Sequence, residues 1–261
     1  MTALKPPSSL SADPAARLVQ TRGEALAMDC GAHFQLNGLT RPPGGVGPAR
    51  VLVVLCHGAS ASGRQMLRFA AAWRDVAPDA AFVAPHAPFA CRSRRSRLLR
   101  AAGLASFAGR QWFSLVDRSA EAEYAGVATA ARLLDRYIDA ELDLHGLTPD
   151  AVVLMGFSQG AIVALSTGLR RAVAPRAILS FSGGVPKLAR FAQDVRNSAP
   201  VLLVHGEADK VLPADRSYEA ARLLQGQDVP VELVLLPLVG HIVNQAGIVA
   251  GARFLRQAMA R

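Results

Sequence analysis

Ser158 stands at the centre of the pentapeptide Gly156-Phe157-Ser158-Gln159-Gly160, which directly follows the apolar run 151–155. A serine hydroxyl is a weak nucleophile in water, so an enzyme that uses one must hold it clear of the backbone, beside a base and beside donors for an oxyanion. A sharp turn from a strand into a helix does this. Such a turn needs glycine at both flanks, because a Cβ there would collide with the neighbouring strand and helix. The motif therefore predicts a serine nucleophile on a strand-to-helix turn.

Candidate partners for Ser158 follow later strands of the chain. His241 lies in the loop after the last predicted strand and is our candidate for the base. His205 is the rival, although a histidine that directly continues a strand more often braces a loop. The third group must be a carboxylate that orients the imidazole and stabilises its developing charge. Asp209 is the preferred carboxylate and Glu207 is the alternative, and the order serine, aspartate, histidine is that of an α/β-hydrolase.

An oxyanion hole requires two backbone N–H groups that point at the developing charge. One is expected from Gln159, the residue after the serine. The other is expected from Ala59, in the early loop 56–63, where small residues let the backbone approach a substrate. Loss of one such donor typically costs about 10²–10³ in rate.

The elements that must position these residues alternate along the chain. Apolar, β-rich runs cover residues 51–56, 80–84, 152–155, 177–181, 201–204 and 231–236. Helical patterns cover residues 63–76, 118–144, 159–171, 215–224 and 244–260. This alternation predicts an α/β fold with a mostly parallel, doubly wound sheet whose strands are covered on both faces. Ligands of such sheets bind beyond the carboxyl ends of the strands, where the candidate residues lie.

Length and composition favour one domain over residues 1–261. The first 50 residues are loosely patterned, with a short strand expected near 32–36. Although 51% of the residues are apolar, no run approaches the roughly 18 apolar residues that a membrane span needs. Residues 1–14 lack the apolar core of a signal peptide. The three cysteines have no metal-like spacing, so we expect free thiols in a reducing cytoplasm, with no metal and no cofactor.

The net charge of +9 is concentrated in one segment. Six arginines and no acid lie between residues 92 and 110, at positions 92, 94, 95, 97, 100 and 110, so the rest of the chain carries only +3. A nucleic-acid-binding protein would show a broader basic face or a recognisable module, and neither is present. We therefore expect no nucleic-acid partner.

Taken together, several motifs resemble the carboxylesterase/phospholipase family of α/β-hydrolases, which includes the acyl-protein thioesterases. The resemblance runs from about residue 51 to the C-terminus. Its motifs are His57-Gly58, Pro85-His86-Ala87-Pro88, Trp112-Phe113, Gly156-Phe157-Ser158-Gln159-Gly160, His205-Gly206-Glu207-Ala208-Asp209 and Gly240-His241. The resemblance implies hydrolysis of carboxylic esters or thioesters through an acyl-serine. It also implies a triad of Ser158, Asp209 and His241, which favours Asp209 over Glu207, and oxyanion donors at Ala59 and Gln159.

The resemblance also suggests where a substrate binds. It implies that the arginine-rich segment 91–111 lies beside an acyl groove as part of a lid, with a solvated surface helix as the alternative. The stretch 183–199 is too short for a large cap domain. Trp112, Phe113, Leu212 and Leu238 are candidates to line the acyl pocket, although apolar residues of this kind more often belong simply to the core. The expected substrate is a small-molecule ester or thioester, with an acylated protein or a lysophospholipid as alternatives. A weak homodimer is left open.

Two other functions are compatible with the same architecture. A lactone or dienelactone hydrolase shares the architecture but commonly uses cysteine as nucleophile, and here Ser158 occupies that position. A non-catalytic ligand-binding receptor on the same fold should have lost one member of the triad, and all three are present. Both alternatives are therefore disfavoured.

Overall fold

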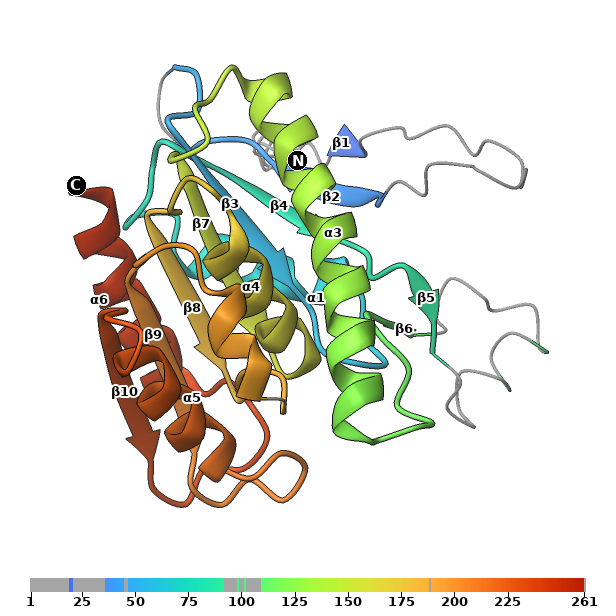
Figure 1. Ribbon diagram of the computed structural model, residues 1–261. Coiled ribbons are helices and arrows are strands. Elements are labelled where there is room, and N and C mark those ends of the chain that lie inside the picture. Colours follow the sequence, from blue (N-terminus) through green and yellow to red (C-terminus); the bar gives the residue numbers. More distant parts are fainter. Residues whose placement is uncertain are drawn as a thin grey trace, which may run out of the picture.

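The computed structural model describes residues 19–20, 36–44, 47–91, 98, 101, 109–187 and 189–260. Its centre is an eight-stranded sheet with the order β1-β2-β4-β3-β7-β8-β9-β10 (Figure 1). The strands are β1 (Val19–Gln20), β2 (Gly38–Arg41), β3 (Val51–Cys56), β4 (Ala80–Pro85), β7 (Val152–Phe157), β8 (Ala177–Phe181), β9 (Val201–Gly206) and β10 (Val231–Leu236). From β4 to β10 all neighbours are parallel, whereas β2 is antiparallel to β4 and to β1.

Helices cover both faces of the sheet, because the side chains of each central strand alternate between two apolar clusters. Leu52 and Val54 of β3 face the cluster formed with α3 (Ala120–His145), α4 (Gln159–Arg170) and α5 (Asp215–Gln225). Val51 and Val53 face the cluster formed with α1 (Gly63–Ala72) and α6 (Gln245–Met259). Figure 1 shows this three-layer arrangement. The predicted mostly parallel, doubly wound α/β sheet is thus confirmed.

Capping residues determine where two of the helices begin or end. The Ser119 hydroxyl accepts a hydrogen bond from the Ala122 N–H at the start of α3, and Gly146 ends that helix in the left-handed conformation at φ 64°. Asn244 caps α6 by accepting from the Gly247 N–H. None of the helices in the described part of the chain is long and apolar enough to cross a membrane.

Two predictions for the N-terminal residues fall largely outside the described part of the chain. The strand expected near residues 32–36 falls almost entirely outside the described residues, and the described edge strand β2 begins at Gly38. The single domain expected over residues 1–261 stays a prediction, and most of residues 1–50 are not described.

A second, two-stranded sheet pairs β5 (Phe89–Ala90) with β6 (Arg110–Gln111) in antiparallel register. It brings the two ends of the arginine-rich segment together beside α3 (Figure 1). Between residues 92 and 108 only Leu98 and Ala101 are described. The predicted lid therefore lies for the most part outside the described residues.

Candidate active site

Ser158 forms the turn between β7 and α4, with a positive φ of 54° and ψ of −122°. Such a conformation is strained for a residue with a side chain, and strain of this kind concentrates at functional sites. A Cβ on Gly156 would lie 2.3 Å from the carbonyl oxygen of Gly160, and one on Gly160 would lie 2.3 Å from that of Cys56. The turn therefore passes so close to β3 and to the start of α4 that only glycine fits at both flanks, as the motif predicts.

The structure brings His241 and Asp209 to this serine from two other loops. His241, in the loop after β10, places Nε2 2.9 Å from the Ser158 Oγ. Its Nδ1 lies 2.6 Å from Oδ2 of Asp209, which follows β9. The three side chains thus form a continuous hydrogen-bonded chain from hydroxyl to imidazole to carboxylate beyond the carboxyl ends of three parallel strands.

The Asp209 carboxylate is buried but well supplied with donors. Its Oδ1 accepts hydrogen bonds from the backbone N–H groups of Val211 and Leu212, at 2.8 and 2.9 Å. Burial by itself would raise the pKa of this carboxyl, but the bonds from Leu212, His241 and Val211 outweigh it, and the pKa lies below its ordinary value. Asp209 is therefore held as an anion whose second oxygen faces the imidazole.

The rival residues, His205 near the end of β9 and Glu207 directly after that strand, have other surroundings. Glu207 is exposed to solvent. His205 is fully buried, with Nε2 2.8 Å from the Leu212 carbonyl oxygen and 3.3 Å from Oδ2 of Asp209, and with Nδ1 2.7 Å from the Ser217 Oγ. His205 thus braces the loop that carries Asp209, and its ring does not contact Ser158.

Gln159 is the first residue of α4, where the N–H groups have no acceptor within the helix. Its side chain has a function that the sequence did not indicate. The amide Oε1 accepts from the Trp112 N–H at 2.8 Å, and Nε2 donates to the Phe113 carbonyl at 2.9 Å. Gln159 therefore joins the start of α4 to the chain that leaves β6.

The sequence indicates Arg110 only as one arginine of a basic segment, and no neighbouring motif distinguishes it from the other arginines. In the structure its side chain donates to the carbonyl oxygens of Ala87 and Pro88. Its backbone accepts from the Ser60 N–H at 2.8 Å and donates to the Ala61 carbonyl at 3.0 Å. Arg110 thus holds the loop that contains Ala59 against a second loop.

A cavity of about 600 Å³ opens at Ser158. Gly58, Ala59, Gln159 and His241 line it, together with two of the four predicted pocket residues, Phe113 and Leu212. The other two predicted residues do not line it. Trp112 is fully buried and donates its Nε1–H to the His57 carbonyl at 2.8 Å. Leu238 is 94% exposed, because its loop projects into solvent beyond β10.

Besides His241, the lining of this cavity includes a set of charged residues that the sequence did not indicate. They are Asp117, Arg118, Glu123, Lys187, Asp215 and Arg216. Arg216 is nearly buried, and its Nη2 lies 2.8 Å from Oε1 of Glu123 and 2.7 Å from the Val185 carbonyl oxygen. These residues come from separate segments, so no sequence motif collects them.

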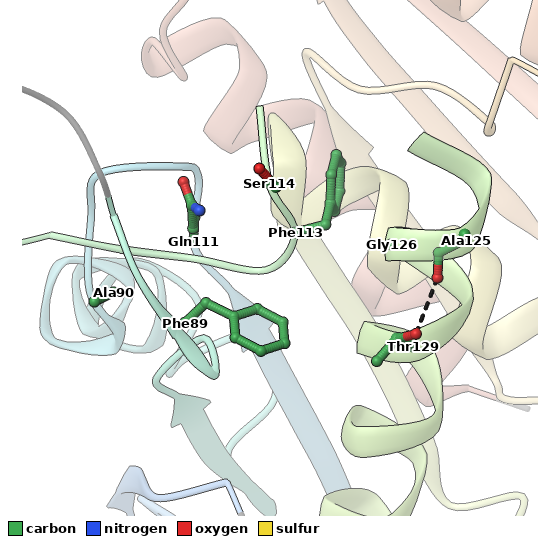
Figure 2. A pocket seen from close by; sticks show the side chains of 8 residues that line it. All are labelled: Phe89, Ala90, Gln111, Phe113, Ser114, Ala125, Gly126 and Thr129. Carbon is green, nitrogen blue, oxygen red and sulfur yellow. Dashed lines mark hydrogen bonds between the residues drawn. The ribbon is translucent and has the colours of Figure 1, made fainter. Parts of the chain in front are cut away.

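A second cavity, of about 580 Å³, lies between the β5–β6 hairpin and α3 (Figure 2). Its lining residues are Phe89, Ala90, Gln111, Phe113, Ser114, Ala125, Gly126 and Thr129. In Figure 2 the rings of Phe89 and Phe113 both extend toward α3. Because Phe113 and Ser114 line both cavities, the second cavity adjoins the first.

The described part of the chain contains no cluster of metal-binding side chains. No group of three or more histidine, cysteine, aspartate or glutamate side chains there could hold a metal ion. His86, which stands between two prolines, accepts a hydrogen bond from the Gly63 N–H at 3.2 Å. It therefore supports the start of α1.

Comparison with known proteins agrees with this geometry. Residues 45–259 match the model of the Phospholipase/Carboxylesterase family. Acyl-protein thioesterase 1 of Gibberella zeae is 31% identical over 121 residues, which cover 44% of this chain and 51% of that protein. Acyl-protein thioesterase 1 of Neurospora crassa is 26% identical over 203 residues, which cover 72% of this chain and 79% of that protein. The match thus spans about half of the first relative and more of the second.

Solved structures show the same fold. The crystal structure of esterase PE8 superposes with a TM-score of 0.76 at 34% identity and covers 86% of this chain and 99% of its own. The Bacillus cereus carboxylesterase superposes with a TM-score of 0.68 at 14% identity, over 85% of this chain and 94% of its own. The family model covers most of the chain, and the site lies within the matched residues. The chain therefore belongs to the phospholipase/carboxylesterase family of α/β-hydrolases.

Proposed function

We propose that this protein hydrolyses carboxylic esters or thioesters through an acyl-serine intermediate. The observation that carries the proposal is the hydrogen-bonded chain from Ser158 through His241 to Asp209 at the mouth of the cavity. Neutral His241 takes the proton from Ser158 Oγ through Nε2 as that oxygen attacks the carbonyl carbon. Asp209 keeps the other ring proton on Nδ1 and stabilises the imidazolium.

The negative charge that develops on the carbonyl oxygen needs donors on the opposite side of the serine. The backbone N–H groups of Ala59 and Gln159 supply them, because both residues line the cavity next to Ser158. The protonated His241 then gives its proton to the leaving alcohol or thiol as the bond to carbon breaks. In the second half-reaction, His241 deprotonates a water molecule that attacks the acyl-serine, and the proton returns to Ser158 Oγ as the acid departs.

The two adjoining cavities support a division of the substrate between them. The cavity between the β5–β6 hairpin and α3, which is mainly apolar and includes Phe89 and Phe113, suits an acyl chain. The charged residues that line the first cavity, Lys187 and Arg216 among them, suit a polar leaving group. Acylated proteins and lysophospholipids both combine an acyl chain with a polar part, so both are proposed as substrates besides small esters.

The compartment is proposed on chemical grounds. Cys56 is a buried thiol in β3, and burial raises its pKa. Such thiols persist in a reducing compartment. We place the protein in the cytoplasm as a proposal, which cell fractionation would check.

The experiment that tests the function combines labelling with kinetics. The parent protein is expected to hydrolyse aryl esters and to be modified at Ser158 by a fluorophosphonate, as located by peptide mass spectrometry. Ser158→Ala should lose both activities, whereas Ser198→Ala, at an exposed serine in the loop before β9, should keep them. Undiminished hydrolysis by Ser158→Ala would refute the proposal. Paired oxygen and sulfur esters of increasing acyl length would then define the preferred substrate.

A further inference from the structure

His57, directly after β3, makes a hydrogen bond with each of its ring nitrogens. Nε2 lies 3.0 Å from the backbone nitrogen of Ala87, and Nδ1 lies 2.7 Å from the carbonyl oxygen of Gly58. A backbone N–H can only donate, so Nε2 must be the acceptor and must carry no proton. The ring proton is therefore on Nδ1, where it donates to the Gly58 carbonyl.

This proton controls the direction of a neighbouring N–H group. The Gly58 carbonyl and the Ala59 N–H belong to one peptide unit, which is planar and trans, so the two groups point in opposite directions. A hydrogen bond that holds the carbonyl toward His57 turns the Ala59 N–H away from the ring. In the described part of the chain no backbone acceptor binds this N–H. It remains available to a substrate.

The same peptide packs directly against the serine turn. A Cβ on Gly58 would lie 3.3 Å from the Ser158 Cβ and 3.2 Å from the Phe157 ring. Gly58 and Ala59 line the cavity together with Ser158. The peptide that His57 orients is thus adjacent to the position where an oxyanion would form.

The ring is protected from protonation. Burial, above all, lowers the pKa of His57 to about 4, and the neighbouring His86 and Arg110 add to the effect. An imidazolium would also lose the acceptor that binds the Ala87 N–H. His57 therefore keeps one tautomer throughout the neutral pH range.

The surrounding loop is fixed from both sides. The His57 carbonyl accepts the Trp112 Nε1–H at 2.8 Å, and the Ser60 N–H donates to the Arg110 carbonyl at 2.8 Å. The Gly58–Ala59 peptide is the part between these two anchors. Within this peptide, the Gly58 carbonyl accepts the hydrogen bond from the His57 side chain.

We propose that His57 is a positioning residue for the oxyanion hole: its Nδ1–H orients and polarises the Gly58–Ala59 peptide so that the Ala59 N–H points at the developing oxyanion. A hydrogen bond to the carbonyl of a peptide strengthens the N–H of the same peptide as a donor. This inference rests on the proposed function, because it concerns the same reaction. His57 itself touches no reacting atom.

The test uses three substitutions that separate the two ring bonds. In His57→Asn the amide NH₂ occupies the place of the Nδ1–H, so the bond to the Gly58 carbonyl is retained. In His57→Gln the longer side chain reaches the Ala87 N–H but offers no donor to the Gly58 carbonyl. His57→Leu removes both bonds.

We expect kcat for an aryl ester to fall by about 10²–10³ in the Gln and Leu variants, as for loss of one oxyanion donor, and by less than about tenfold in the Asn variant. KM should change little. The inhibition constant of a trifluoromethyl ketone, which forms an oxyanion on reacting with a serine, should rise in proportion to the loss in kcat/KM. If His57 only stabilised the fold, the substitutions would lower the melting temperature, but kcat would not differ between the Asn and Gln variants.

Full kcat in folded His57→Gln or His57→Leu would overturn the inference, and so would an Asn variant no better than Gln. Should the variants fail to fold, nitrogen NMR of the parent protein decides: a proton on Nε2 of His57 at neutral pH would overturn it. Ser158→Ala separates the two proposals. If that variant is inactive while the His57 variants are fully active, only the inference about His57 fails.

Discussion

Replacing Asp209 by asparagine exchanges one carboxylate oxygen for an NH₂ group and keeps the shape of the side chain. The surroundings determine which way the amide lies. The N–H groups of Val211 and Leu212, at 2.8 and 2.9 Å from Oδ1, both require an acceptor there. The opposite orientation would leave these two N–H groups facing an NH₂ group, at about 1–3 kcal/mol for each buried donor left unsatisfied. The new NH₂ group must therefore face His241.

This orientation reverses the tautomer of the base. Nδ1 of His241, which lies 2.6 Å from Oδ2 in the parent protein, must then accept a proton from the amide instead of donating one. The ring proton moves to Nε2, which faces the Ser158 Oγ at 2.9 Å and can no longer accept the serine proton. A wrong tautomer of this kind costs about 10⁴ in kcat, or about 5 kcal/mol in the activation barrier.

The assay is steady-state hydrolysis of an aryl ester by Asp209→Asn, with thermal unfolding measured alongside. The matched control is Glu207→Gln, which neutralises an exposed acid two residues earlier in the same loop and should keep full activity. The Asn variant should remain folded, because both backbone bonds to the side-chain oxygen are retained. A kcat within tenfold of the parent, or an equal loss in Glu207→Gln, would refute the reasoning.

Two further predictions concern stability. In Gly160→Ala the new Cβ would lie 2.3 Å from the Cys56 carbonyl oxygen and 2.5 Å from the His57 carbonyl oxygen, so we expect the free energy of unfolding, measured in urea, to fall by about 1–3 kcal/mol. The control is Gly226→Ala, whose new Cβ would have its nearest neighbour 3.4 Å away. Equal stability of the two variants would contradict this prediction. Because the pKa of His57 is about 4 in the folded protein and 6.5 as its ordinary value, the unfolded chain binds the extra proton between these pH values. The contribution of His57 to the free energy of unfolding is therefore complete above pH 6.5 and declines by about 3 kcal/mol as the pH falls to 4. A pH series of urea titrations should show this decline in the parent protein and lack it in His57→Asn.

The parallel strands could be predicted because each is buried on both faces and therefore reads as a continuous apolar run. The strands 177–181 and 231–236 were predicted with the bounds that the structure has. The edge strand β2 was missed, because its sequence Gly-Leu-Thr-Arg is short and half polar. It is a strand because β4 offers an open edge to which its backbone can bind.

The pocket residues show where residue type stops being informative. Phe113 and Trp112 are adjacent and both aromatic, yet Phe113 lines both cavities while Trp112 is buried beneath the loop of His57. Leu212 and Leu238 both follow parallel strands, yet only Leu212 lines the cavity. Apolar character is common to all four residues, and the packing of the loops separates them.

By itself, the amino-acid sequence determined that a serine turn, acids and histidines follow successive strands, because the carboxyl ends of parallel strands meet at one edge of the sheet. Only the tertiary structure decided which of them bind each other. His241 and Asp209 reach a common hydrogen-bonded chain with Ser158, whereas Glu207 faces solvent and His205 braces a loop. Hydrogen bonds require atoms placed within a few tenths of an ångström, and that placement depends on loops that are distant in sequence and packed against one another.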